Sequence, residues 1–182
     1  MGARRRAGGE KLSPAAILPD VIEPGLRVVF CGSAAGTVSA QRGAYYAHPQ
    51  NRFWSTLHGI GLTPRRLAPE EFRTLPHYGL GLTDLAKHVS GSDASLPREA
   101  DDPEGLRARI ETIAPHVLAF NGKRPAGVFF RALFGIRALD YGPQSQTIGA
   151  TAIVVLPSTS PAARGFWTPD PWRALARRVE NL

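Results

Sequence analysis

Residues 28–54 read VVFCGSAAGTVSAQRGAYYAHPQNRFW. The apolar run at the start of this stretch, 28–31, predicts a buried strand. The small residues that follow, GSAAG at 32–36, let the backbone approach a ligand closely. We expect a helix to begin near Arg52, with Asn51 as its N-cap. A strand, an open loop and a helix in this order are typical of an α/β domain with a pocket at the carboxyl edge of its sheet.

The common nucleotide-binding signatures are missing from the chain. The dinucleotide pattern G-x-G-x-x-G is absent. The phosphate-loop pattern is absent as well, because Arg124 follows Gly122-Lys123 where that pattern needs Ser or Thr. The sequence therefore disfavours a generic nucleotide-binding turn.

Two further apolar runs predict strands, at 116–120 and 152–156. Helical patterns lie between and after the strands, at 52–60, 69–75, 104–113, the residues after Asn121, and 170–180. The pattern predicts an irregular segment at 78–85 and a loop or short strand at 135–146. We expect an α/β fold, a three-layer α/β/α single domain whose central, mainly parallel sheet has about four strands.

A length of 182 residues suits one domain with a sizeable core. We interpret residues 1–20, basic and then rich in Pro and Ala, as a flexible basic tail, and 21–182 as the folded domain. No apolar run approaches the roughly 18 residues of a membrane helix, and no apolar signal region follows the arginines at 4–6. We expect a cytoplasmic monomer without a membrane partner.

The charge balance favours a polyanionic partner. The chain has 22 Lys and Arg against 15 acidic residues, a net charge of +7, which suits nucleic acid. An ordinary basic protein remains the alternative on charge alone. The single cysteine, Cys31, excludes an internal disulfide and an all-cysteine metal cluster, and the five His residues lack metal-ligand spacing. We expect no metal and no cofactor.

The first stretch resembles a known motif. It is similar to the first motif of the mismatch-specific uracil-DNA and thymine-DNA glycosylases. The matching residues are Gly32, Gly36, the aromatic Tyr46 and the run HPQNRFW at 48–54. One departure matters: SAA at 33–35 replaces Ile-Asn-Pro, and Ala34 cannot position the attacking water as the family's Asn does. The Gly-Ser start and the paired tyrosines are similar to the related hypoxanthine-DNA glycosylase branch.

A second stretch, LPSTSPAAR at 156–164, resembles the family's second motif. In the family this loop enters the minor groove beside the extruded nucleotide. Since Ala162 and Ala163 offer little volume, we expect Arg164 to fill the space. A proline-stiffened surface loop is the alternative. The resemblance implies these DNA-binding residues: Ser160, Pro161, Ala162, Ala163 and Arg164.

The resemblance also implies a base pocket. Tyr46 would stack on the flipped base, and the donor and acceptor of the Asn121 carboxamide suit the edge of uracil. Backbone N–H groups near Ser33 would stabilise the departing base anion. Structural roles remain the alternatives: a core or rim tyrosine for Tyr46, and a helix N-cap or turn residue for Asn121. The expected base-binding residues are Gly32, Ser33, Ala34, Tyr46, Asn121 and Ser158.

Catalysis needs a substitute for the missing Asn. Asp84, in GLTDL at 81–85, aligns with a family segment near the pocket, and a carboxylate can orient water and attract a cationic sugar. Asn51 is the second catalytic candidate. A loop acid bound to nearby backbone is the alternative for Asp84.

Taken as a whole, the resemblance implies a monofunctional DNA glycosylase of base excision repair. It would flip uracil, hydrolyse the N-glycosidic bond and leave an abasic site, without a cofactor. Two alternatives stay open: a hypoxanthine-DNA glycosylase, and a catalytically weak protein that only binds uracil or abasic DNA.

Overall fold

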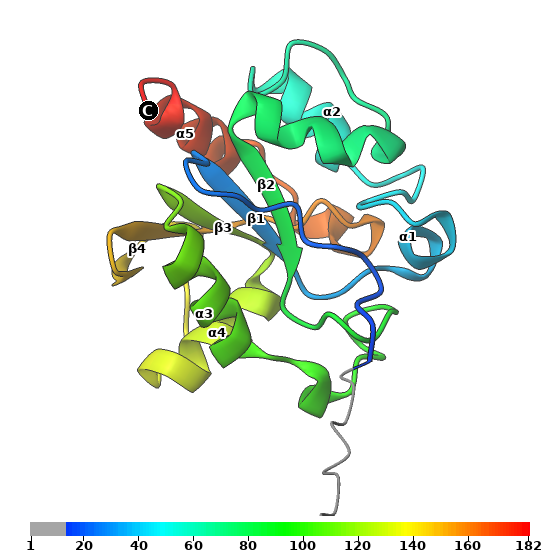
Figure 1. Ribbon diagram of the computed structural model, residues 1–182, viewed down its shortest axis with the longest axis vertical. Coiled ribbons are helices and arrows are strands. Elements are labelled where there is room, and N and C mark those ends of the chain that lie inside the picture. Colours follow the sequence, from blue (N-terminus) through cyan, green and yellow to red (C-terminus); the bar gives the residue numbers. More distant parts are fainter. Residues whose placement is uncertain (1–13) are drawn as a thin grey trace, which may run out of the picture.

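The computed structural model describes residues 14–182, and its centre is a five-stranded sheet in the order β2-β1-β3-β5-β4 (Figure 1). Four strands run parallel: β1 (Val28–Gly32), β2 (Leu80–Asp84), β3 (Val117–Asn121) and β5 (Thr151–Leu156). The fifth, β4 (Gly142–Ile148), pairs antiparallel with β5. The carboxyl ends of the four parallel strands therefore meet at one edge.

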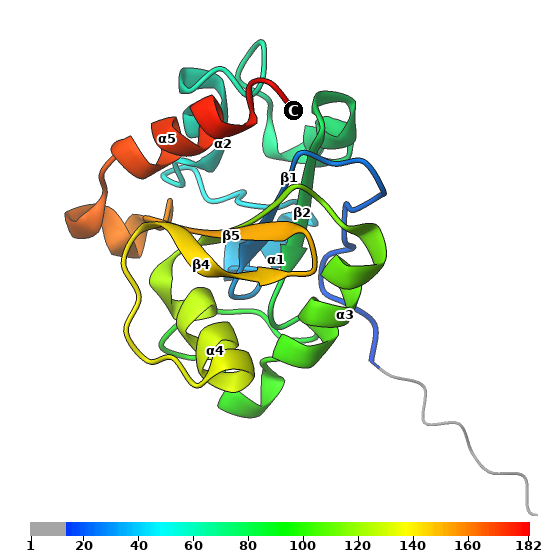
Figure 2. The ribbon, with the colours of Figure 1, turned by 90° about the vertical axis from the view of Figure 1, so that its left-hand side faces the viewer.

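Helices cover both faces of the sheet, and Figure 2 shows the sheet between them. One face packs against α2 (Phe53–Gly59), α5 (Asp170–Val179) and the 3₁₀ segment η1 (Pro69–Tyr78). The other packs against α3 (Pro103–Ile113) and α4 (Lys123–Phe134). Side chains alternate between the two cores, so that Phe30 joins the first and Cys31 the second. The expected three-layer α/β/α domain is confirmed.

Three short elements lie outside these layers. They are α1 (Thr37–Arg42) and the 3₁₀ segments η2 (Arg98–Ala100) and η3 (Pro161–Phe166). The helical turn α1 falls in a segment that the sequence pattern predicts as an open loop.

The sheet has one strand more than expected. The segment predicted as irregular contains the regular strand β2, in register with β1 from Val28↔Leu80 to Gly32↔Asp84. A Cβ at Gly81 would lie 2.6 Å from the Val21 carbonyl oxygen, so this glycine lets the N-terminal segment approach β2. The polar strand β4 forms the opposite edge, where its exposed side chains face solvent.

The predicted tail, 1–20, needs a correction at its end. Residues 1–13 lie outside the described part of the chain. Leu18, however, is buried, and Val21 exchanges two backbone hydrogen bonds of 2.9 Å with Leu82. The last residues of the expected tail therefore pack on the domain. Within residues 14–182, no helix has the length and apolar character needed to cross a membrane.

Candidate active site

The carboxyl ends of β1, β2, β3 and β5 bring together the four segments that follow these strands. In the sheet order, β2 lies on one side of β1 and β3 on the other, so the strand order reverses beside β1. Ligands of open α/β sheets bind in the crevice at such a point. Gly32, at the end of β1, is paired in register with Asp84 of β2.

Two side-chain oxygens converge on Gly32. A Cβ there would lie 2.8 Å from Asp84 Oδ1 and 3.2 Å from the Tyr46 hydroxyl. Asp84 is only 3% exposed, and no described residue donates a hydrogen bond to its carboxyl group. The absence of a side chain at position 32 is thus what lets a carboxyl group and a phenol approach the same point.

Burial raises the pKa of Asp84 from its ordinary value to about 7, with Lys87 opposing the shift and Asp20 adding to it. Asp20 holds the neighbouring cations. Its Oδ1 lies 2.6 Å from Lys87 Nζ, its Oδ2 lies 3.3 Å from Arg109 Nε, and it accepts a hydrogen bond from Thr83. Asp84 is therefore poised to change protonation near neutral pH.

Tyr46 is held in a strained position. Its φ of 52° is in the left-handed region, and its ring stacks on Phe53 with centroids 4.1 Å apart. Within the described chain its buried hydroxyl has no hydrogen-bond partner that meets normal geometry. Burial, and then the Asp84 charge, raise the pKa of this hydroxyl, while the Asn121 side chain acts in the opposite direction.

Asn121 joins two loops. Its Nδ2 donates to Thr159 Oγ1 at 2.9 Å, and its Oδ1 accepts from the Thr159 backbone N–H at 3.0 Å. One amide hydrogen and one lone pair remain for a base. Gly122, and not Asn121, is the N-cap residue of α4.

The loop after β5 is tied internally and to the first stretch. Ser158 Oγ accepts from Ser160 N, and Ser160 Oγ accepts from Ala162 N at the start of η3. The Arg52 N–H donates to Thr159 O at 3.1 Å, and Arg164 Nη2 to Gln50 Oε1 at 3.3 Å. The two stretches that the sequence singles out are therefore in direct contact.

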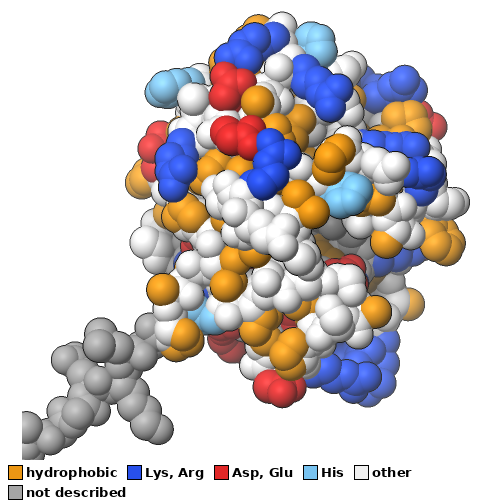
Figure 3. All heavy atoms as spheres, turned by 90° about the vertical axis from the view of Figure 1, so that its right-hand side faces the viewer, with side chains coloured by type: hydrophobic (Ala, Val, Ile, Leu, Met, Phe, Trp, Pro, Cys, Tyr) orange, Lys and Arg blue, Asp and Glu red, His pale blue; other side chains and the backbone are white. Residues whose placement is uncertain are grey.

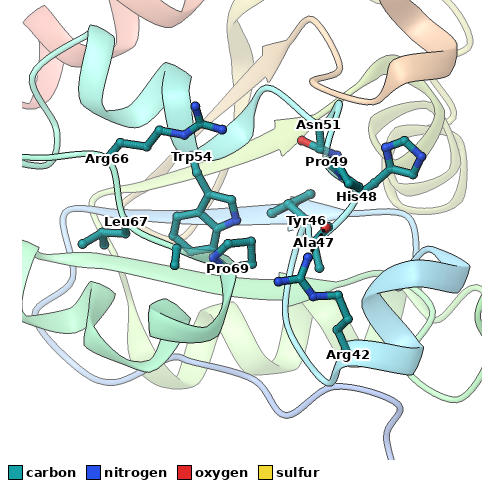
Figure 4. Close-up of a pocket in the computed structure, with 11 residues that line it drawn as sticks. Arg42, Tyr46, Ala47, His48, Pro49, Asn51, Trp54, Arg66, Leu67 and Pro69 are labelled. Atoms are coloured by element: carbon teal, nitrogen blue, oxygen red, sulfur yellow. Dashed lines mark hydrogen bonds between the residues drawn. The ribbon is translucent and has the colours of Figure 1, made fainter.

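Asn51 is not among the residues within 4 Å of a Cβ at Gly32. Its Oδ1 accepts from Phe53 N at 3.0 Å, but the N-cap residue of α2 is Arg52 and not Asn51 as predicted. Asn51 and Tyr46 line a cavity of about 330 Å³ that Trp54 and the Arg66–Pro69 segment close on the other side (Figure 4). Of the two catalytic candidates, only Asp84 lies beside Gly32.

The remaining predicted residues surround these groups. Ser33 is 8% exposed, Ala34 is half-buried directly after it, and both follow β1 at its carboxyl end. Pro161 and Ala163 are half-buried in η3, whereas Ala162 and Arg164 are exposed. Figure 3 shows Lys and Arg side chains on the upper part of the face that carries α1. Among the described residues, no group of three or more His, Cys, Asp or Glu side chains is arranged to hold a metal ion.

Sequence reasoning missed the groups behind Asp84, which are Asp20, Lys87 and Arg109. Asp20 falls at the end of the expected tail, and only the short apolar run that precedes it, ILP at 17–19, hints that this segment packs. Thr159 lies inside the second stretch, but its pairing with Asn121 depends on β3 and β5 being neighbours.

Two comparisons relate the chain to known proteins. The family model described as the uracil DNA glycosylase superfamily matches residues 19–177. A solution NMR structure of a Methanosarcina acetivorans protein, provisionally assigned as a uracil DNA glycosylase, is 28% identical, with a TM-score of 0.63. The match covers 90% of this chain and 97% of that one.

Proposed function

The chain belongs to the uracil DNA glycosylase superfamily, and on that basis we propose that it excises uracil from DNA by hydrolysing the N-glycosidic bond. The observation that carries this proposal is the buried Asp84 carboxyl beside Gly32, at the carboxyl ends of β1 and β2. The flipped nucleotide would bring its C1′ to this carboxyl, and the product is an abasic site.

Each group has a role in the proposed reaction. The C1′–N bond breaks to give a cationic sugar and an anionic base. Asp84, as a carboxylate, attracts the cation and accepts a proton from the water whose oxygen bonds to C1′. Backbone N–H groups of Ser33 and Ala34 stabilise the base anion. Asn51 is the second candidate for orienting the water, through the amide nitrogen that its hydrogen bond with Phe53 N leaves free.

The base would be recognised by stacking and by hydrogen bonds. Phe53 covers one face of Tyr46, which leaves the other face for a flipped base. The remaining amide hydrogen of Asn121 would bind a base oxygen, with Gly32 and Ser158 forming the walls. Residues 160–164 would contact the DNA strand, and the protein would act as a monomer in the cytoplasm.

Hypoxanthine is the second candidate base. The Gly-Ser start at 32–33 and the Tyr45-Tyr46 pair favour it. A protein that binds uracil or abasic DNA without turnover is the third candidate, because Ala34 stands where relatives carry the water-positioning Asn.

A panel of labelled duplexes tests these candidates. Each duplex carries one U, T, hypoxanthine or xanthine and is treated with alkali after incubation, which cleaves abasic strands. We expect cleavage of the uracil strand and its loss in Asp84→Ala. Cleavage of the hypoxanthine strand alone would select the second candidate, and a gel shift without cleavage would select the binder.

A further inference from the structure

A second cavity, of about 520 Å³, lies at the edge of the sheet opposite the candidate active site. It is lined by Arg27, which directly precedes β1, whereas Gly32 ends that strand. The five residues of β1, at about 3.3 Å each, place Arg27 about 16 Å from Gly32. The cavity is therefore separate from the groups around Asp84.

The lining of this cavity has an excess of positive charge. Arg27 precedes β1, Arg173 and Arg177 lie on α5, and Glu180 directly follows that helix. The other lining residues are 59–62, at the end of α2, and Ala176. Figures 1 and 2 both show the C-terminal end of α5 near the start of β1. Three guanidinium groups thus line one space together with a single carboxylate.

Arg27 is held in place by the backbone. Its Nη1 donates to Val179 O at 3.0 Å, and its Nη2 donates to Tyr78 O at 2.8 Å. A Cβ at Gly79 would lie 2.9 Å from Arg27 Nε, so this glycine leaves room for the guanidinium group. A guanidinium group has five N–H donors, and these bonds use only two of them. Arg27 is therefore a fixed cation with donors left for a ligand.

The arginine charges are largely uncompensated within residues 14–182. No carboxylate of the described chain lies within 4 Å of a charged nitrogen of Arg27 or Arg177. Arg173 Nη1 lies 3.4 Å from Asp170 Oδ1, but both side chains are more than half exposed, and such pairs contribute little. A helix C-terminus attracts cations, which accounts for Arg27 and Arg177 but not for Arg173, one turn earlier on α5.

We propose that this cavity binds a small molecule through a chain of at least two phosphates. Guanidinium groups donate paired hydrogen bonds to phosphate oxygens, and Arg173 and Arg177, one helical turn apart, suit neighbouring phosphates. The volume lies within the range of small-molecule sites, about 300–1,000 Å³. Ile60 and Leu62 add apolar surface that a nucleoside would contact. Pyrophosphate and a nucleoside diphosphate share this chemistry, and the site does not depend on the proposed function.

Isothermal titration calorimetry with pyrophosphate and with ADP, both without divalent metal, tests this site. We expect the wild-type protein to bind both ligands. Arg173→Ala and Arg177→Ala should each weaken binding about tenfold, the loss of one charge-assisted hydrogen bond. Glu180→Gln should strengthen binding, because it removes the carboxylate from the lining. Equal affinities would mean that the phosphates alone are recognised, whereas tighter binding of ADP would identify a nucleotide.

Arg178→Ala is the matched control, since Arg178 is exposed on the same helix and does not line the cavity. It removes the same charge and should leave both affinities unchanged. Equal weakening by Arg178→Ala, or no binding of either ligand by the wild-type protein, would overturn the site. Weaker binding of undamaged duplex DNA by Arg173→Ala and Arg177→Ala, without binding of pyrophosphate or ADP by the wild-type protein, would identify a second DNA contact instead. The titration contains no damaged DNA, so a failure of the proposed function would leave its result intact.

Discussion

The regions that follow β1 and β5 differ in whether their polar side chains have hydrogen-bond partners. After β5, the side chains of Ser158, Thr159 and Ser160 are all hydrogen-bonded within the loops. Around the end of β1, no described residue is a hydrogen-bond partner of the buried Tyr46 hydroxyl, and none donates to the Asp84 carboxyl. Buried polar groups that lack partners cost free energy, and proteins retain them where a ligand supplies the partner.

The two regions therefore have different expected roles, the first in the reaction and the second in holding the DNA. The side near β1 holds reactive groups in an unsatisfied state, whereas the side near β5 is a rigid support. Asn121 connects the two sides through its two hydrogen bonds with Thr159. Changes on the β1 side should alter the rate of excision, and changes on the β5 side should alter the affinity for DNA.

The largest effect is expected for Asp84→Ala. A positioned acid–base group typically contributes about 10²- to 10⁴-fold, so single-turnover excision should fall by that factor. Binding to abasic DNA should be nearly unchanged. Rates close to wild type would remove Asp84 from the reaction and turn attention to Asn51.

Asp84 should also make the free energy of unfolding depend on pH. The folded-state pKa of Asp84, about 7, lies above its unfolded value near 4, so the folded protein binds the proton more tightly. The free energy of unfolding should therefore decrease as pH rises from about 4 to about 7. Asp84→Asn should weaken this dependence and be more stable than wild type at pH 8, as measured by urea unfolding.

Asn121→Ala should have the next largest effect, because it removes both bonds to Thr159 and leaves buried groups unpaired. We expect a loss of about 1–3 kcal/mol in the free energy of unfolding. Thr159→Val is the comparison, since it removes only the side-chain bond and should cost less. Equal losses would mean that the backbone bond from Thr159 contributes nothing.

The strands that sequence patterns predicted are those with continuous apolar runs, 28–31, 116–120 and 152–156. β2 was not predicted as a strand because Gly79 and Gly81 interrupt its apolar run. The glycine at position 81 is explained only by the structure, in which Val21 packs against it. For β4 the pattern predicts either a loop or a short strand, because an edge strand needs no apolar run. For the site, the sequence placed Asn121 at the end of a predicted strand and Asp84 in a segment that it predicts as irregular. It could not reveal that Asn121 binds Thr159 or that Asp20 lies behind Asp84, because both contacts depend on strand order.

Tyr46→Phe should have opposite effects on stability and activity. Removal of a buried hydroxyl without a partner should raise the free energy of unfolding by about 1 kcal/mol. Excision should slow if the hydroxyl binds water or base beside Asp84. A variant that is more stable and equally active would limit Tyr46 to stacking, and Tyr46→Ala would then be the more damaging change.

The smallest effect, a shift along the pH axis, is expected for Asp20→Asn. Asp20 raises the pKa of Asp84, whereas Lys87 and Arg109, which Asp20 binds, lower it. Loss of the Asp20 charge leaves both cations to act on Asp84, so the pKa of Asp84 should fall below about 7. If excision needs the Asp84 carboxylate, the rise of single-turnover rate with pH should move to lower pH. The other titratable groups facing Asp84 are Cys31, Tyr45 and Tyr46.

Two variants make this shift specific to the position of Asp20. Asp20→Glu keeps the charge and should restore the wild-type midpoint. Glu111→Gln removes a carboxylate from the exposed pair with Arg107 on α3 and should leave the midpoint in place. If Asp20 only holds the N-terminal segment against β2, Asp20→Asn would lower the rate equally at every pH. A fixed midpoint would thus separate a purely structural contact from one that sets when Asp84 is charged.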